Sequence, residues 1–290
     1  MEFKISNEYL ELVVSSKGAE KQSLISKQTN INYLRDVDGF WNRKAPLLFP
    51  IVGKLRDLKT FINNKEYSMN QHGFVRDQEF ELYSQTENKL VLVNSYSEET
   101  LKMYPFKYKV YVTYTLNGKQ LDTEFKVVNE DYQVIPFNYG GHPGFRVPLY
   151  ENETFEDYKI VFEKEENFDA PTVMLENGTL NFVNTVKYEK VKELQLNYKY
   201  FEIDAIVNPK IKSQSVKLVN KDNKGIKFDF IGFPSLAIWT KPNAPFVCLE
   251  PWIGYADHHD SNYQFIEKDN MQFLNPECEA KATYSITVLE

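Results

Sequence analysis

The clearest pattern along the chain is an alternation of hydrophobic and polar residues between positions 106 and 127. Apolar or aromatic side chains occupy positions 106, 108, 110, 112, 114 and 116, and lysine or threonine fills most positions between them. After Asn117-Gly118, a pair that favours a tight two-residue turn, the alternation returns at 121, 123, 125 and 127. This period of two predicts a pair of antiparallel strands with one buried and one solvated face.

Similar but shorter patterns predict an almost entirely β chain. Strands or hairpins are expected from residue 3 onward, at 61–69 around Asn63-Asn64, and at 89–96, 158–162, 215–219, 226–230, 236–240, 246–249 and 284–288. Ser97 is expected to cap one or two helical turns that end before Pro105. Apart from its short strand, the segment 151–166 carries little pattern.

The composition is that of one folded domain with a sizeable core. Hydrophobic residues make up 42% of the chain, charged residues 26% and aromatic residues 15%, which excludes a disordered chain. We find no internal repeat, low-complexity tract or linker, and large β domains can exceed 200 residues. Residues 1–290 are therefore expected to form a single β domain.

Charge and hydropathy narrow the expected partners and location. A net charge of −7 and a pI near 5.4 argue against a nucleic-acid partner, because phosphate backbones are bound by basic surfaces. The sequence contains neither a signal peptide nor an apolar run long enough for a membrane span. We therefore expect a cytoplasmic protein, in which Cys248 and Cys278 are free thiols and Cys248 is buried.

One histidine lies in a segment whose backbone freedom is tightly constrained. Residues 138–148 read Asn-Tyr-Gly-Gly-His-Pro-Gly-Phe-Arg-Val-Pro, and we call them the histidine turn. Pro143 fixes its own φ and disfavours a helical conformation at His142, while the glycines allow left-handed conformations or close backbone contact. A histidine held in this way beside a cleft can donate or accept a proton near neutral pH. The alternative is a loop histidine with one backbone hydrogen bond.

Glu250 is the second candidate for proton transfer. It follows the apolar strand predicted at 246–249 and precedes Pro251-Trp252, so we expect its carboxylate at a strand end, against an indole and partly removed from water. Burial raises the pKa of a carboxyl group toward neutrality, which suits a general base. The alternative is a glutamate at a strand end that faces water.

Other polar residues near predicted strand ends could complete a site. His72, beside Gly73, has the same two interpretations as His142, and Asp204 lies in an otherwise apolar stretch where it could instead cap a turn. Lys54 and Arg56 are two positions apart, so both side chains leave the same face if the chain is extended there.

Several other chemistries find little support in the sequence. Asp-His-His-Asp at 257–260 contains metal-ligating residue types, but adjacent histidines point in different directions and no spaced partner motif is present, so a solvated loop is expected. Gly-Gly-His-Pro-Gly has the spacing of neither nucleotide-binding loop, and no Gly-x-Ser-x-Gly elbow is present. The remaining histidines, carboxylates, cations and aromatic residues suit proton transfer on a polyhydroxylated ligand.

Six segments, taken together and in order, resemble the aldose 1-epimerases, or galactose mutarotases, especially the shorter bacterial subgroup associated with lactose operons. They are Ser-Lys-Gly-Ala-Glu at 16–20, Phe-Pro-Ile-Val-Gly-Lys-Leu-Arg-Asp at 49–57, Gln-His-Gly-Phe-Val-Arg-Asp at 71–77, Gly-His-Pro-Gly-Phe at 141–145, Asp-Ala at 204–205 and Leu-Glu-Pro-Trp at 249–252. The resemblance runs through most of the chain. It implies an all-β fold, the large antiparallel galactose mutarotase-like supersandwich, with an open cleft and no metal or cofactor.

The resemblance also implies roles for individual residues. Glu250 matches the general base that removes the proton from the C1 hydroxyl of a pyranose, and His142 matches the general acid that protonates the ring oxygen. The ring opens to the aldehyde, the C1–C2 bond rotates, and the reverse transfers close the ring to the other anomer. His72 matches a second histidine that binds the sugar near its ring oxygen, and Asp204 matches a carboxylate that binds sugar hydroxyls.

Two positions depart from the family pattern. Lys54 stands where galactose mutarotases have an arginine and cannot form the same bidentate contact, although Arg56 could compensate. Arg146 stands where a smaller polar residue is common. Cations at the cleft could instead hold a sugar phosphate, as in the related hexose-6-phosphate mutarotases, with Arg56 and Arg76 as the phosphate ligands.

The predicted function is therefore a mutarotase that acts on a hexose such as galactose or glucose. Three alternatives remain open at this point: a hexose-6-phosphate mutarotase, a non-catalytic sugar-binding protein on the same scaffold, and a carbohydrate hydrolase or lyase. The last would use Glu250 with Asp204 or Asp77 as a pair of carboxylates.

Overall fold

The hairpin predicted at 106–127 lies near the centre of the larger of the two sheets that form the sandwich. In the computed structural model, which describes residues 1–37 and 39–290, β9 (Tyr108–Asn117) and β10 (Gln120–Asn129) pair antiparallel and bury alternate side chains. The turn is formed by Gly118 and Lys119, one residue later than predicted. Gly118 adopts φ 58°, a left-handed conformation that glycine adopts without strain and that suits the first position of this tight turn.

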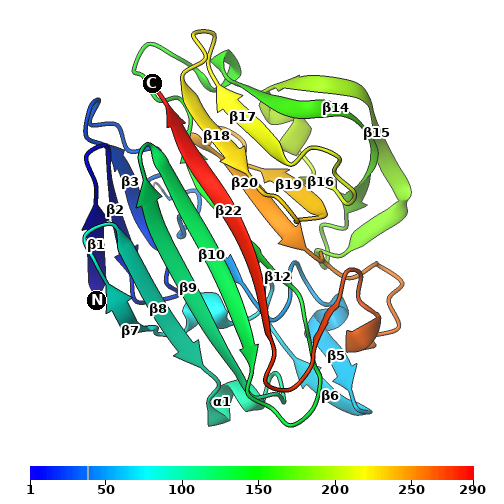
Figure 1. Ribbon diagram of the computed structural model, residues 1–290. Coiled ribbons are helices and arrows are strands. Elements are labelled where there is room, and N and C mark those ends of the chain that lie inside the picture. Colours follow the sequence, from blue (N-terminus) through cyan, green and yellow to red (C-terminus); the bar gives the residue numbers. More distant parts are fainter. Residues whose placement is uncertain (38) are drawn as a thin grey trace.

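The larger sheet has nine strands in the order β15-β14-β17-β18-β22-β10-β9-β8-β7 (Figure 1). Its last strand in sequence, β22, pairs with β10 on one side and β18 on the other, so it joins the early and late parts of the chain. The remaining strands are β7 (Glu81–Gln85), β8 (Lys89–Ser95), β14 (Lys159–Val173), β15 (Leu180–Gln195), β17 (Ser215–Val219), β18 (Gly225–Asp229) and β22 (Glu279–Leu289).

A second sheet of six strands packs against the larger one, behind it in Figure 1. Its strands are β4 (Leu47–Leu48), β12 (Tyr139–Gly141), β13 (Gly144–Arg146), β16 (Ile206–Asn208), β19 (Ser235–Trp239) and β20 (Phe246–Ile253). Aromatic rings fill the space between the sheets: Phe125 of β10 stacks on Tyr139 of β12 with centroids 5.6 Å apart, and Phe145 of β13 lies 5.7 Å from Phe228 of β18. The fold is thus the predicted antiparallel β-sandwich.

Smaller elements cover the ends of the sandwich. They are the three-stranded sheet β1 (Glu2–Ser6), β2 (Leu10–Ser15) and β3 (Lys21–Ser26), the hairpin β5 (Lys59–Ile62) and β6 (Lys65–Ser68), the pair β11 (Ile135–Phe137) and β21 (Gln272–Leu274), the helix α1 (Glu98–Leu101), and 3-10 helices at Arg56–Leu58, Val75–Asp77, Phe155–Asp157, Tyr198–Phe201 and Phe265–Glu267. The helix begins at the predicted cap, because the Ser97 side chain accepts a hydrogen bond from the Thr100 amide at 3.2 Å, but it ends at Leu101. No helix in the described part of the chain is long and apolar enough to cross a membrane.

Two elements are longer than the sequence patterns indicated. The segment that predicted only a short strand at 158–162 begins the long hairpin β14–β15, whose register shifts three times and whose outer strand is mostly exposed. Bulges interrupt the period of two, and an edge strand with little burial has no hydrophobic alternation to detect. Strand β20 also continues past residue 249 to Ile253, so Glu250 lies inside a strand rather than at its end.

A buried lysine lies between the small sheet and the sandwich. The Nζ of Lys21 in β3 donates to the hydroxyl of Tyr284 in β22 at 2.7 Å and lies near the rings of Tyr284 and Tyr114. No carboxylate among the described residues forms an ion pair with it, and burial lowers the pKa of Lys21 to about 7, with Glu20 opposing the shift. The small sheet and the sandwich therefore meet around the Lys21 amine, whose uncharged form is favoured by burial.

We predict that Lys21 makes stability depend on pH between about 7 and 10. In this range the unfolded chain holds the lysine proton and the native state loses it, so stability falls as the pH decreases toward the native pKa of about 7. Chemical denaturation should show Lys21→Met gaining stability relative to wild type as the pH falls, by up to about 1.4 kcal/mol per pH unit. Lys102→Met, at a side chain that is 67% exposed, is the control; equal pH dependence in both variants would contradict the prediction.

Candidate active site

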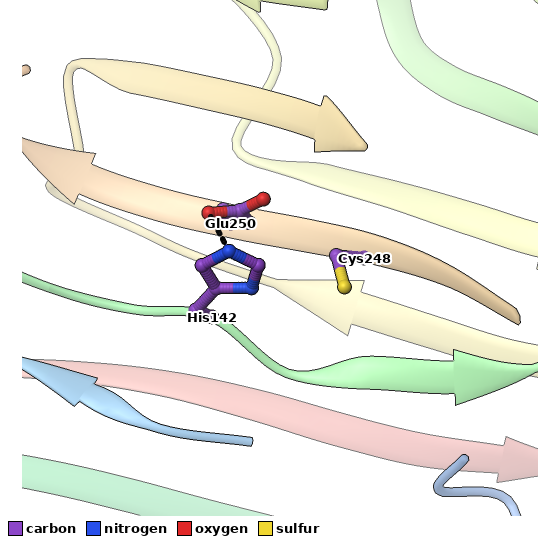
Figure 2. Close-up of side chains that lie close together, drawn as sticks. All are labelled: His142, Cys248 and Glu250. Carbon is purple, nitrogen blue, oxygen red and sulfur yellow. Dashed lines mark ion pairs between the residues drawn. The ribbon is translucent and has the colours of Figure 1, made fainter. Parts of the chain in front are cut away.

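The histidine turn lies between two short strands that both pair with β20. Gly140 of β12 is opposite Trp252, and Gly144 of β13 is opposite Cys248. His142 therefore faces Glu250, the residue of β20 midway between these partners. Its Nε2 lies 3.0 Å from Oε2 of Glu250, and the two side chains are only 8% and 2% exposed (Figure 2).

Small residues let the histidine turn approach its neighbours closely. A Cβ at Gly141 would lie 2.7 Å from the ring of Tyr284, and one at Gly140 would lie 2.7 Å from the carbonyl oxygen of Pro251. The backbone amide of His142 donates to the carbonyl of Pro46 at 2.9 Å. Pro251 is tolerated inside β20 because the ladder toward the histidine turn is interrupted between Gly140 and Gly144. The imidazole is thus held by backbone contacts on both sides of the turn.

A cleft of about 510 Å³ opens over this pair. Six of the seven candidate site residues line it: Lys54, His72, Arg76, His142, Asp204 and Glu250. They come from the loop after β4, the residues around the 3-10 helix Val75–Asp77, the histidine turn, the loop before β16, and β20. Residues spread over about two thirds of the chain therefore meet at one place.

His72 is oriented by the backbone of the segment that carries Lys54. The amide of Gly53 donates to Nδ1 of His72 at 3.0 Å, so Nδ1 is the unprotonated nitrogen and the neutral ring carries its hydrogen on Nε2. His72 has φ 65°, and its ring centroid lies 5.4 Å from that of His142 at nearly a right angle. The structure therefore gives the cleft a fixed N–H donor beside His142.

Burial shifts the pKa values of the central groups toward their uncharged forms. It lowers the pKa of His142 to about 3, with Arg76 adding to the shift, and it lowers the pKa of His72 well below its ordinary value. Burial also raises the pKa of Glu250 well above its ordinary value, helped by the nearby charge of Asp204 and opposed by the Trp252 indole. Burial therefore favours a protonated carboxyl group on Glu250 beside a neutral imidazole on His142.

Asp204, Lys54 and Arg76 surround this pair with groups that can bind hydroxyls or anions. Burial raises the pKa of Asp204, while hydrogen bonds from Ala205 and Trp239 and the charge of Lys241 oppose the shift. The Nζ of Lys54 has no hydrogen bond or ion pair with any described residue. Arg76 donates to the carbonyl of Gln71 at 2.5 Å, and burial lowers its pKa to about 10.

Arg56 does not line the cleft, so it does not join Lys54 there as the sequence suggested. Leu55 between the two residues is extended, with φ −76° and ψ 143°, but Arg56 then begins a 3-10 turn in which Asp57 has φ 51°. The Arg56 guanidinium donates to the carbonyl of Ser261 at 2.7 Å and lies 4.8 Å from the ring centre of Tyr263. It therefore cannot stand in for an arginine at position 54. Arg146 is exposed and does not line the cleft either.

Two further candidates also lie outside the cleft. Asp77, considered as a second carboxylate, is 2.6 Å from Nη2 of Arg43 and does not line the cleft. In the loop at 257–260, Asp257 pairs with Lys268 at 2.5 Å and His258 pairs with Asp269 at 2.7 Å. Within the described residues, no three metal-ligating side chains converge in that loop.

The sequence analysis missed several residues of the cleft wall. Trp41 and Trp239 were not predicted there, whereas Trp252 was expected beside Glu250, and all three tryptophans of the chain line the cleft. The ring centroid of Trp41 lies 4.6 Å from that of His142. Lys241 and the connection between β14 and β15 complete the wall. The scarcity of tryptophan was a usable signal, since large aromatic residues commonly line sugar sites, whereas the β14–β15 connection had no sequence signal.

Comparison with known proteins assigns this fold and cleft to a family. The sequence profile of aldose 1-epimerase matches residues 1–287, and the chain belongs to the aldose 1-epimerase family. The plasmid and chromosomal LacX proteins of Lactococcus lactis subsp. lactis are each 35% identical over 299 aligned positions, which cover 100% of both chains.

Solved structures agree with this assignment. A galactose mutarotase related enzyme from Lactobacillus acidophilus is 30% identical and superposes with a TM-score of 0.94 over 100% of this chain and 98% of that one. A galactose mutarotase-like protein from Lactobacillus casei ATCC 334 is 27% identical, with a TM-score of 0.91 and full coverage of both chains.

We predict that Glu250 destabilises the fold increasingly as the pH rises. Its native pKa is raised above the unfolded value, so the native state holds a proton that the unfolded chain has lost, and stability falls as the pH rises toward the native pKa. Urea denaturation from pH 5 upward should show Glu250→Gln gaining stability over wild type by up to about 1.4 kcal/mol per pH unit. Glu99→Gln, at a side chain that is 78% exposed, should give a difference that does not change with pH. The prediction fails if Glu250→Gln behaves in the same way.

Proposed function

We propose that the protein is a mutarotase that interconverts the α and β anomers of a free hexose such as galactose or glucose. The observation that carries this proposal is the 3.0 Å separation of His142 Nε2 and Glu250 Oε2 at the cleft. The two oxygens that exchange protons in an anomerisation, O1 and the ring oxygen O5, are both bonded to C1. A nearby acid and base therefore match the two oxygens of one acetal carbon.

The pKa shifts of the pair fit this reaction. Mutarotation needs one group that takes a proton while its neighbour gives one, and burial favours a protonated carboxyl group on Glu250 beside an imidazole on His142 that is free to accept a proton. Although the two atoms lie close together, Glu250 Oε2 has no partner in hydrogen-bond geometry. The carboxyl oxygen is therefore not tied to the imidazole and can turn to a sugar hydroxyl.

In the proposed mechanism the single proton moves across the pair and back. The proton must first move from Glu250 to His142, against the direction in which burial shifts both pKa values. The resulting carboxylate removes the proton from O1 while the imidazolium protonates O5. The C1–O5 bond breaks, the C1–O1 double bond forms, and the pair is left with its proton on Glu250. After rotation about C1–C2, O5 attacks C1 from the other side, returns its proton to His142, and O1 recovers a proton from Glu250.

Other cleft residues would bind the sugar rather than transfer protons. The Nε2–H of His72 is a fixed donor suited to the ring oxygen or a neighbouring hydroxyl, because its tautomer is set by Gly53. Asp204 can accept from hydroxyls, and Lys54 can donate to them. The indoles of Trp41 and Trp239 offer apolar faces for the C–H surface of a pyranose.

A sugar phosphate is a second candidate substrate, and it is favoured by the cations of the cleft. Lys54, Arg76 and Lys241 line the cleft, and neither lysine is paired with a carboxylate among the described residues. Against this candidate, Arg56 points away, so the positive charge is smaller than the sequence suggested. Asp204 also adds a carboxylate to the same wall.

We predict that the activity depends on both members of the pair. Polarimetry starting from pure α-galactose or α-glucose should show faster equilibration with the wild-type protein than in buffer. Glu250→Gln and His142→Gln should each lower kcat/KM by roughly 10²- to 10⁴-fold, because each removes one proton-transfer partner. Asp77→Asn, outside the cleft, is the matched control.

Other outcomes would separate the alternatives. Saturable sugar binding without any effect on the rate of anomerisation would indicate a non-catalytic binding protein. Release of reducing ends from an oligosaccharide, dependent on both Glu250 and Asp204, would indicate a hydrolase or lyase. Either result would overturn the proposed mutarotase function.

We predict that Lys54 contributes similarly to neutral and phosphorylated sugars. Lys54→Ala should lower kcat/KM for galactose and for galactose 6-phosphate by similar factors, since a lysine that binds hydroxyls does not discriminate between them. Arg56→Ala should leave both values unchanged, because Arg56 lies outside the cleft. A loss at least tenfold larger for the phosphorylated sugar, together with a wild-type preference for it, would identify the second candidate as the substrate.

A further inference from the structure

A third side chain converges on the pair of His142 and Glu250. Cys248 and Glu250 are two residues apart on β20, so both side chains leave the same face of the strand, and the histidine turn crosses in front of them (Figure 2). One ligand atom from each of the three residues lies within 4.8 Å of the other two, and all three residues are buried. Within residues 1–37 and 39–290, this is the only such group of three metal-ligating side chains.

Two atoms of this group lack hydrogen-bond partners. Neither Nδ1 of His142 nor Oε2 of Glu250 makes a hydrogen bond, although both atoms are buried. Buried polar atoms are almost always hydrogen-bonded, and exceptions often mark a functional role or a bound ion. The site therefore presents unused lone pairs at the same place as a thiol.

We propose that His142, Cys248 and Glu250 form a reversible binding site for Zn²⁺, and that its occupation blocks proton transfer. The blocking effect rests on the function proposed above, whereas the binding of the metal does not. One nitrogen, one sulfur and one oxygen donor suit Zn²⁺, and a thiol makes Mg²⁺ or Ca²⁺ unsuitable occupants. Three protein ligands would leave the fourth tetrahedral position to a water or a sugar hydroxyl on the cleft side.

The distances require only a small adjustment. Tetrahedral Zn²⁺ with bonds of about 2.0–2.3 Å holds its ligand atoms roughly 3.4–3.7 Å apart. The ligand atoms of the three residues lie within 4.8 Å of one another. Side-chain movements of about 1 Å would therefore close the site around the ion.

The charges balance when the ion is bound. Zn²⁺ with a Cys248 thiolate and a Glu250 carboxylate is a neutral set, which suits a buried location better than any ionised member alone. Binding would release the thiol proton of Cys248 and the proton of any protonated Glu250 carboxyl group to solvent, with no redox change. Cys248 packs beneath Trp41 and Trp239, so the ion would enter from the cleft.

Occupation would stop the proposed reaction because the metal uses the lone pairs that move protons. The Glu250 oxygen could no longer accept the O1 proton, and an imidazole bound to the metal through either nitrogen could no longer become the imidazolium that protonates O5. Zn²⁺ would therefore act as a reversible inhibitor and not as a cofactor.

The binding test uses Co²⁺ as a spectroscopic probe and Cys278 as the matched control, because Cys278 is an exposed thiol and Cys248 is buried. Wild-type protein and Cys278→Ala should show a thiolate-to-cobalt charge-transfer band in the near ultraviolet and intense visible bands of a tetrahedral site. Cys248→Ala and Cys248→Ser should lack the thiolate band. Competition with a chromophoric chelator should show that both Cys248 variants bind Zn²⁺ at least roughly 100-fold more weakly than wild type. A thiolate band that persists in both Cys248 variants, or Zn²⁺ affinities that do not change, would overturn the proposal.

The inhibition test separates this proposal from the proposed function. Stoichiometric Zn²⁺ should inhibit mutarotation by wild type and Cys278→Ala, a chelator should restore it, and Cys248→Ala should keep its basal activity and resist Zn²⁺. Mutarotation that is insensitive to Zn²⁺ in protein that lacks the cobalt band would refute the metal site and leave the mutarotase function intact. A cobalt band in protein without mutarotase activity would refute the function and leave the metal site intact. His258→Asn reports any binding at the exposed His258 and Asp269 pair, and inhibition that disappears in this variant would also overturn the proposal.

Discussion

The close approach of the histidine turn to β20 is the constraint on which the site depends. Two short strands, β12 and β13, pair with successive parts of the same long strand, and the residues between them bring His142 over Glu250. Only glycine fits at Gly140 and Gly141, because a side chain there would collide with Pro251 or Tyr284. The geometry of a proton-transfer pair is therefore set by backbone packing between the two sheets.

Burial then gives this geometry its chemistry. Removing His142 and Glu250 from water disfavours charge on both, which lowers the pKa of the imidazole and raises the pKa of the carboxyl group. The same environment leaves unpaired lone pairs beside the Cys248 thiol. His142, Glu250 and Cys248 therefore also resemble three ligands of a metal site. Proton transfer and metal binding compete for the same atoms.

The surrounding cleft is assembled from segments far apart in the chain. The loop after β4 supplies Lys54, the segment before β16 supplies Asp204, and the long hairpin β14–β15 supplies part of the wall. The hairpin β14–β15 belongs to the larger sheet, in which β22 pairs with strands from both halves of the sequence, whereas β4 and β16 belong to the six-stranded sheet. The last strand of the chain thus helps fix a cleft whose lining residues all precede it.

Local sequence patterns were sufficient for the regular strands and for most candidate site residues. Alternation at 106–127 and the Asn63-Asn64 turn specified their hairpins, because side-chain period and turn chemistry act over a few residues. The constrained backbone around His142 and the apolar run before Glu250 marked both residues, and the family resemblance supplied their order and roles. The position of Arg56 was not predicted correctly, because its guanidinium contacts Ser261 and Tyr263, which are distant in the sequence and lie outside the cleft.

Only the tertiary structure decided which residues of the site lie beside one another. The 3.0 Å separation of His142 and Glu250, the tautomer of His72 set by Gly53, and the meeting of three tryptophans all arise from pairings between distant segments. The sequence also did not show that Cys248 lies beside His142 and Glu250, because the sequence predicted only that Cys248 is a buried thiol. By itself, the sequence determined the strands, the family and the chemical types available, since these depend on local pattern. The position and charge state of each group followed from folding, because distance and burial are properties of the packed sheets.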